Sequence, residues 1–180
     1  MRILIISADG FEDSELLKPR DACTDAGMQV DIASFGRGPI VGKHRCEVEA
    51  GIAIDEVRPE DYDALILPGG TAPKKLRRSA EVLAVVRAFF KAGKPVGAIC
   101  HAPQILISAG VLSNRSATCY KTVAHELAAA GACYRDSEVV VDANLVTSRK
   151  PSDLPAFVRE LMRKLRARQT QTPVTGTAGR

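Results

Sequence analysis

Residues able to do chemistry stand directly after three short apolar runs of the sequence. Glu12 follows the first run, the pair Gly69 and Gly70 follows the second, and Cys100 with His101 follows the third. In an open parallel sheet the carboxyl ends of the strands share one edge, and ligands bind at that edge. A thiol, a carboxyl group and a turn without side chains, brought together there, would suit nucleophilic catalysis.

Cys100 lies where an apolar run passes directly into a helical pattern, in the order expected of a nucleophile elbow. A thiol at the start of a helix meets the positive end of the helix dipole, so the position predicts a lowered pKa and a thiolate. The backbone N–H groups of His101 and Gly70 are placed to bind a developing oxyanion. Gly69 and Gly70 would serve there because a side chain would obstruct the approach.

Glu12 is the predicted proton carrier, since the loop after the first strand ends at the same sheet edge. Beside a thiolate its charge would be repelled, which predicts a raised pKa and a carboxyl able to shuttle a proton.

Each of these residues also has a purely structural interpretation. Free cysteines are often buried packing residues, Glu12 could favour the start of a helix, and Gly69 with Gly70 could form only a turn. His44 and Cys46 could offer two metal ligands, but no second pair accompanies them, so no metal is predicted.

The elements that must position these residues alternate between strands and helices. This order predicts an α/β fold with a mostly parallel sheet covered on both faces. Strands are expected at 2–7, 30–35, 64–67, 95–99, 116–119, 138–141 and 145–148, a hairpin at 36–54, and helices at 13–26, 79–92, 100–110, 122–130 and 153–168. Pro19 predicts a kink or a late start of the first helix, and Ser79 and Thr122 are expected helix caps.

The chain has 180 residues, of which 46% are hydrophobic and 26% are charged, so one globular domain over 1–168 is expected, with a loose tail over 169–180. Six of the 25 basic residues lie between Arg159 and Arg180. Because that excess sits on the last helix and in the tail, no nucleic-acid partner is expected. Five cysteines without a C-x-x-C pair, and no apolar run long enough to cross a membrane, predict a cytoplasmic protein without disulfides.

Several segments closely resemble the ThiJ/PfpI family over about residues 1–166. The matching segments are Ser7-Ala8-Asp9-Gly10-Phe11-Glu12-Asp13-Ser14-Glu15-Leu16, Ala33-Ser34-Phe35, Val41-Gly42-Lys43-His44, Tyr62-Asp63-Ala64-Leu65-Ile66-Leu67-Pro68-Gly69-Gly70, Gly93-Lys94-Pro95-Val96, Ile99-Cys100-His101-Ala102-Pro103-Gln104-Ile105-Leu106-Ile107-Ser108-Ala109, Glu138-Val139-Val140-Val141-Asp142 and Val146-Thr147-Ser148-Arg149.

The resemblance implies a flavodoxin-like three-layer sandwich of the class I glutamine-amidotransferase type, assembled as homodimers that can stack into hexamers. It also implies activity without a cofactor, either as an intracellular cysteine peptidase or as a glyoxalase or deglycase acting on methylglyoxal and its early protein adducts. The nucleophile maps onto Cys100, its acidic partner onto Glu12 and the adjacent histidine onto His101. Tyr120 matches a tyrosine that lines the pocket in some members.

Two positions depart from the family pattern. Peptidase-type relatives carry a glutamate where this chain has Lys74, and lysine cannot accept the imidazole proton as a carboxylate does. Ala102 replaces the usual glycine after the Cys-His pair.

Three functions follow as hypotheses. The first is conversion of a 2-oxoaldehyde to a hydroxy acid through a hemithioacetal on Cys100, with Glu12 moving the proton. The second is peptide hydrolysis by Cys100 and His101. The third is a redox-responsive stress protein or chaperone in which Cys100 is oxidised.

Overall fold

The computed structural model describes residues 1–171, and its centre is a seven-stranded sheet in the order β10-β11-β7-β6-β1-β2-β5. Neighbouring strands in this sheet are parallel except β10 and β11, which form an antiparallel edge pair. The strands are β1 (Arg2–Ile6), β2 (Gln29–Ser34), β5 (Ile52–Ala53), β6 (Ala64–Leu67), β7 (Val96–Ile99), β10 (Val139–Asp142) and β11 (Leu145–Ser148).

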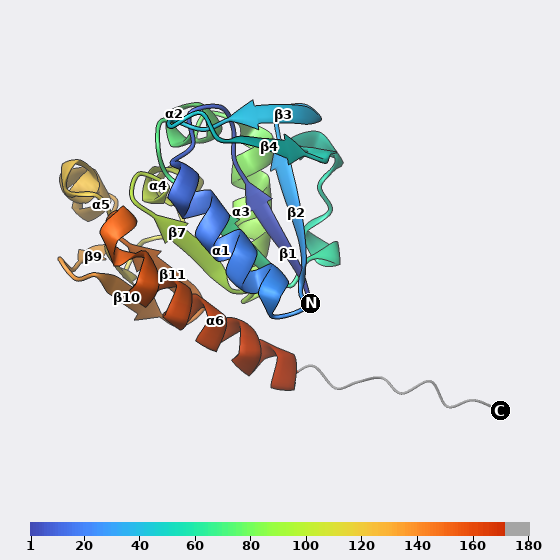
Figure 1. Cartoon of the computed structure of the whole chain (residues 1–180). Helices are drawn as coiled ribbons and strands as arrows, with labels where there is room; N and C mark the ends of the chain where they lie inside the picture. Colours follow the sequence, from blue (N-terminus) through green and yellow to red (C-terminus); the bar gives the residue numbers. More distant parts are fainter. Residues whose placement is uncertain (172–180) are drawn as a thin grey trace.

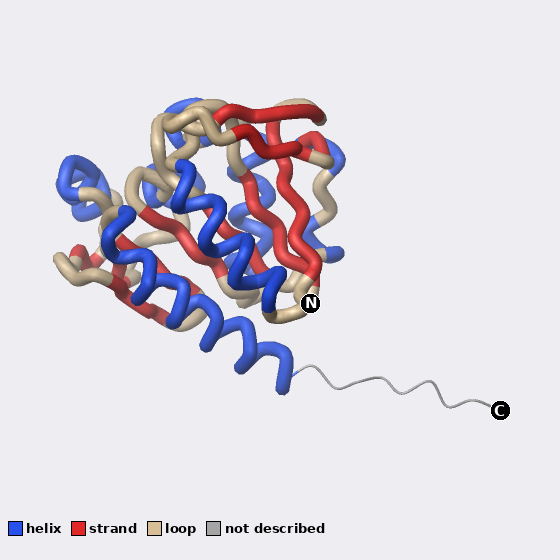
Figure 2. The backbone as a smooth tube through the Cα atoms, viewed as in Figure 1, coloured by secondary structure: helices blue, strands red, loops and turns tan. Residues whose placement is uncertain are grey.

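Helices cover both faces of the sheet, so the molecule has three layers (Figures 1 and 2). Helices α1 (Asp13–Asp25) and α6 (Leu154–Gln171) pack together on one face, and α3 (Ala80–Lys91) lies on the opposite face with α4 (Pro103–Ala109). The short helices are α2 (Pro73–Leu76) and α5 (Ala124–Ala129). This is the mostly parallel sheet covered on both faces that the alternation of strands and helices predicts, and the flavodoxin-like sandwich that the family resemblance implies.

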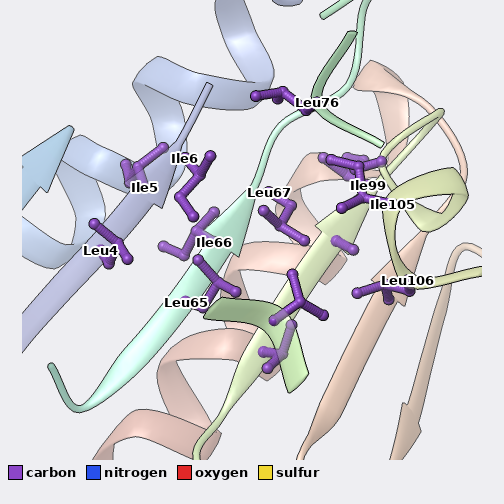
Figure 3. Packing of buried hydrophobic residues seen from close by; sticks show 14 of the residues in the cluster. Leu4, Ile5, Ile6, Leu65, Ile66, Leu67, Leu76, Ile99, Ile105 and Leu106 are labelled. Atoms are coloured by element: carbon purple, nitrogen blue, oxygen red, sulfur yellow. The ribbon is translucent and has the colours of Figure 1, made fainter. Parts of the chain in front are cut away.

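The core is built from central strands that are apolar on both faces. Every residue of β6 and β7 is buried, as is every residue of β1 after Arg2. Parallel strands between two helical layers bury both of their faces, which is why these strands read as continuous apolar runs. Figure 3 shows Leu4, Ile5 and Ile6 beside Leu65, Ile66 and Leu67, with Ile99, Ile105 and Leu106 continuing the cluster.

Two small two-stranded sheets stand outside the central one. One joins β3 (Gly38–Val41) antiparallel to β4 (Glu47–Ala50), and the other joins β8 (Ser116–Ala117) parallel to β9 (Cys133–Tyr134). The turn of the first is tied to α1 because Asp13 accepts hydrogen bonds from the backbone N–H groups of His44 and Cys46, both at 2.9 Å. The loop that carries Lys43 is therefore held at the start of α1.

Most predicted elements are present, with shifts at several ends. Ser79 caps α3 as predicted, since its hydroxyl accepts from the Val82 N–H at 3.2 Å. Of the two effects predicted for Pro19, a kink or a late helix start, the late start is wrong, because α1 already begins at Asp13 with the proline inside it. Thr122 does not cap a helix either. It lies within a 3₁₀ turn, Lys121–Val123, which leads into α5.

The end of the domain also differs from the prediction. A 3₁₀ turn, Pro151–Asp153, precedes α6, which continues to Gln171 and so runs past the predicted boundary at 168. The remainder of the predicted loose tail, 172–180, lies outside the described residues. All five cysteines are free thiols, as predicted. Across residues 1–171, no helix has the length and apolar character needed to cross a membrane.

Candidate active site

Cys100 occupies a sharp turn between β7 and α4. Its φ of 62° lies in the left-handed region, which is unfavourable for a residue with a side chain. Two hydrogen bonds hold the strained backbone from both sides, from the Cys100 N–H to the Ser148 carbonyl at 3.0 Å and from the Tyr120 N–H to the Cys100 carbonyl at 2.8 Å. The turn is a nucleophile elbow, as the sequence predicts.

Two backbone N–H groups point at the sulfur of Cys100. They belong to His101 and to Gly70, and both favour the thiolate form. Gly70 has a φ of 84°, and a Cβ there would lie 2.3 Å from the carbonyl oxygen of Gly10. A Cβ on Gly69 would lie 2.6 Å from a carboxyl oxygen of Glu15 and 2.8 Å from Cβ of Cys100. Only glycines allow the end of β6 to approach this closely.

The carboxyl group beside the thiol belongs to Glu15, which is fully buried. Its Oε2 accepts from the Gly69 N–H at 2.9 Å, and the carboxyl interacts directly with the Cys100 thiol. Burial raises the pKa of Glu15 to about 8, and the nearby charge of Glu12 adds to this, while the Gly69 N–H opposes it. Glu15 is thus a neutral carboxylic acid at neutral pH, next to the nucleophile.

Glu12, the predicted partner of Cys100, faces other groups. Its carboxylate lies 3.3 Å from Nε2 of His44 and 3.6 Å from Nζ of Lys43. The place expected for Glu12 beside the sulfur is taken by Glu15, one helical turn further along α1. The sequence carried a signal for this, because Glu15 lies at i, i+4 and i+8 spacing with Pro19 and Cys23, which are buried on the same side of the helix.

The expectation of a lowered thiol pKa is not met. Burial raises the pKa of Cys100, and the negative charge of Glu15 raises it further, against the two N–H groups that lower it. The helix dipole contributes little because α4 has only seven residues and begins at Pro103, beyond the turn. A thiolate at this site therefore requires Glu15 to keep its proton.

His101 lies next to the thiol, with Nδ1 3.2 Å from the sulfur. Burial lowers the pKa of His101, and the positive charges of Lys74 and Lys43 lower it further. The imidazole is therefore neutral near pH 7 and able to accept a proton. Its ring packs against Tyr120 at a centroid distance of 4.8 Å.

Both departures from the family pattern are accommodated locally. Lys74 is exposed on α2, and its positive charge lowers the pKa of His101. The histidine therefore has a cation nearby in place of the carboxylate that orients it in peptidase-type relatives. Ala102 is fully buried with φ −59° and ψ −31°, a helical conformation that requires no glycine.

The site thus defines a class of protein, a flavodoxin-like α/β fold with a cysteine in a strand-to-helix elbow, flanked by a neutral histidine and a buried carboxylic acid. Residues 1–164 match the model of the DJ-1/PfpI family, and the chain belongs to that family.

Individual relatives agree with this assignment. The chain is 50% identical over 166 residues to the protein named Deglycase TK1284 of Thermococcus kodakarensis, covering 92% of this chain and 100% of the relative. It is 45% identical over 169 residues to Protein/nucleic acid deglycase 2 of Escherichia coli K12, covering 92% and 98%. The solved structure of Schizosaccharomyces pombe DJ-1 superimposes with a TM-score of 0.84 at 26% identity, covering 96% of this chain and 100% of that one.

Proposed function

We propose that this protein is a cofactor-independent cysteine enzyme that acts on 2-oxoaldehydes such as methylglyoxal and on their early adducts with protein groups. The observation that carries the proposal is the placement of Cys100 between an acid with a pKa of about 8, Glu15, and the neutral imidazole of His101. The names of the relatives from Thermococcus and Escherichia, both deglycases, support the same chemistry.

In the first step the sulfur of Cys100 forms a bond to the aldehyde carbon. The thiol proton passes to Nδ1 of His101, which lies 3.2 Å away. The carbonyl π electrons move to oxygen, where the N–H groups of Gly70 and His101 stabilise the negative charge. Glu15 then donates its proton to that oxygen, which completes a hemithioacetal and leaves Glu15 as a carboxylate.

In the second step Glu15 moves a proton between the two substrate carbons. Its carboxylate removes the hydrogen of the carbon bonded to sulfur, and the proton is returned to the neighbouring carbonyl carbon. The hydroxyl proton on the first carbon passes to the oxygen of the second. The first carbon is thereby oxidised to a thioester and the second is reduced to an alcohol, so no external redox partner is needed. Water cleaves the thioester, and the cysteine sulfur recovers its proton from His101. The 2-hydroxy acid leaves as its carboxylate, and the proton that it gives up returns to Glu15.

Turnover of methylglyoxal by purified variants tests this proposal. Cys100→Ala is expected to abolish it, and Glu15→Gln to reduce kcat at least 100-fold because an amide cannot carry the proton. Glu12→Gln is the matched control on the same helix, and it is expected to retain most activity because its carboxylate faces Lys43 and His44. Full activity of Cys100→Ala or Glu15→Gln, or loss of activity only in Glu12→Gln, would contradict the mechanism.

Peptide hydrolysis is a second candidate, favoured by the 3.2 Å contact between the Cys100 sulfur and the imidazole of His101. Lys74 argues against it, because it stands where peptidase-type relatives carry a glutamate, and lysine cannot accept the imidazole proton as a carboxylate does. Short fluorogenic peptides should therefore be cleaved poorly by the native protein. Cleavage that rises sharply in Lys74→Glu, measured beside methylglyoxal turnover, would restore the peptidase hypothesis.

We also propose that the protein acts in the cytoplasm as a homodimer that can stack into a hexamer. Five free thiols are consistent with a reducing compartment. The assembly is checked by the molar mass from light scattering at several concentrations.

A further inference from the structure

A cavity of about 290 Å³ lies beside the active site, walled by three segments that are distant in the sequence. They are the chain leading from β8 to α5, the end of β9 with the residues after it, and the loop between β11 and α6. Figure 1 shows α5, β9 and the start of α6 on the same side of the molecule. The lining residues are Cys119, Tyr120, Lys121, Tyr134, Asp136, Arg149 and Lys150.

Tyr120 connects this cavity to the nucleophile. Its backbone N–H donates to the Cys100 carbonyl at 2.8 Å, and its ring packs on His101 at 4.8 Å. The same side chain lines the cavity. A substrate whose reacting carbon lies at the sulfur can therefore extend past His101 and Tyr120 into this space.

The charge in the cavity is predominantly positive. Arg149 is bound to Asp136 at 2.8 Å and to Asp153 at 2.8 Å, which fixes its side chain and offsets its charge. Lys121 and Lys150 have no carboxylate within ion-pair distance among the residues that the structure describes. Their ammonium groups remain available to an anion, and Tyr134 adds an aromatic wall.

We propose that this cavity is a subsite for the anionic, non-reacting part of the substrate. The inference rests on the proposed aldehyde chemistry at Cys100 and adds a substrate class to it: adducts whose thiol or amine component bears a carboxylate or a phosphate. That component is released with its proton when the aldehyde re-forms for Cys100, and its anionic group does not react. A volume of about 290 Å³ is at the lower end of small-molecule sites, so the occupant is a single amino-acid or nucleotide group.

Paired substrates that differ only in charge test the subsite. One pair is the methylglyoxal hemithioacetals of N-acetylcysteine and of its neutral amide. The other is the methylglyoxal adducts of guanosine 5′-monophosphate and of guanosine. In each pair the anionic member should show the lower KM with a similar kcat, because the cavity binds a part of the substrate that does not react.

The variant Lys121→Gln/Lys150→Gln removes both free charges. Since an exposed ion pair contributes about 0.2–1 kcal/mol, the two together should raise the KM for the anionic substrates about 2- to 30-fold. KM for the neutral partners and for methylglyoxal itself should not change. Lys91→Gln is the control, because Lys91 is exposed at the end of α3 and does not line the cavity.

Equilibrium binding separates this inference from the proposed reaction. In Cys100→Ala no turnover is expected, yet guanosine 5′-monophosphate should bind more tightly than guanosine, and N-acetylcysteine more tightly than its amide. A preference in only one pair identifies the anion as phosphate or carboxylate. The preference should disappear in the double lysine variant and weaken as salt rises.

The inference is overturned if charged and neutral members of both pairs bind Cys100→Ala equally. It is also overturned if Lys121→Gln/Lys150→Gln has no more effect than Lys91→Gln. Failure of the proposed function would give a different result: methylglyoxal turnover would persist in Cys100→Ala.

Discussion

The protonation states of Cys100 and Glu15 depend on each other, because both groups are buried side by side and a negative charge on one disfavours a negative charge on the other. Burial raises the pKa of both groups, and the charge of Glu15 raises that of the thiol. The two groups therefore titrate as a pair, in which ionising one favours the neutral form of the other. The thiol of Cys100 therefore becomes a reactive thiolate only when His101 or a substrate oxygen takes up a proton, and without substrate it stays in its neutral, less reactive form.

This pairing makes stability depend on pH. The pKa of Glu15 is about 8 in the folded protein against 4.5 ordinarily, so between these values the folded state holds a proton that the unfolded state releases. The free energy of unfolding should then fall as pH rises, by up to about 1.4 kcal/mol per pH unit from this group. Urea unfolding at pH 5, 6.5 and 8 should show this slope in the native protein.

Glu15→Gln should remove the slope, because an amide does not titrate. Glu47→Gln, which replaces an exposed carboxyl on β4, is the control and should keep it. Equal pH dependence in the native protein and in Glu15→Gln would show that the buried carboxyl is not neutral in the folded state.

At the scale of elements, the site exists because the ends of three strands meet without side chains between them. The loop after β1 runs across Gly70, where Phe11 forms an isolated bridge, and the Glu12 N–H donates to the Gly69 carbonyl at 3.2 Å. This contact brings the start of α1, and with it Glu15, over the end of β7. Both glycines are therefore positioning residues for the carboxyl, and Gly70 also supplies an N–H group to the proposed oxyanion site.

Gly69→Ala tests this packing. The new methyl group would lie 2.6 Å from a Glu15 carboxyl oxygen and 2.8 Å from Cβ of Cys100, so one of them must move. We expect a loss of about 1–3 kcal/mol in stability and a fall of about 100-fold in kcat for methylglyoxal. Gly36→Ala is the control, because a Cβ there meets nothing within 4 Å. Unchanged turnover in Gly69→Ala would contradict this account.

At the scale of the whole molecule, one continuous core joins both helical layers to the sheet. Strands β1, β6 and β7 supply its centre, and α6 lies so close to β7 that a Cβ on Gly97 would be 3.0 Å from the ring of Phe157. The proposed catalytic site lies at the end of these same strands. Its geometry therefore depends on the packing of the entire sheet.

Ile66→Ala should lower the free energy of unfolding by about 2–5 kcal/mol, because Ile66 is fully buried at the centre of the sheet and its loss leaves a cavity. Lys91→Gln, an exposed change, should stay within about 0.5 kcal/mol of the native protein. Urea unfolding measures both. A change below 1 kcal/mol for Ile66→Ala would mean that the core relaxes to fill the space.

The sequence alone determined the α/β class, the central strands and the elbow cysteine. Apolar runs such as 64–67 and 96–99 must be buried on both faces, and only a sheet between two helical layers allows this. Periodicity and capping, as at Ser79, are local properties, so they too could be read directly. The predicted start of a helix at Thr122 and the predicted end of the last helix at 168 differ from the structure. Packing against neighbouring elements decides where a helix with weak local end signals starts or stops.

Only the tertiary structure decided which acid serves the thiol and in which proton state. Glu12 and Glu15 are three residues apart at the start of one helix. Helical spacing places Glu15 on the buried side with Pro19 and Cys23, but it does not say which strand end that side meets. The approach of α1 to Gly69 directs Glu15 to Cys100 and leaves Glu12 to Lys43 and His44. Burial then sets the pKa values, because the cost of a charge depends on all the atoms around it and not on its neighbours in the chain.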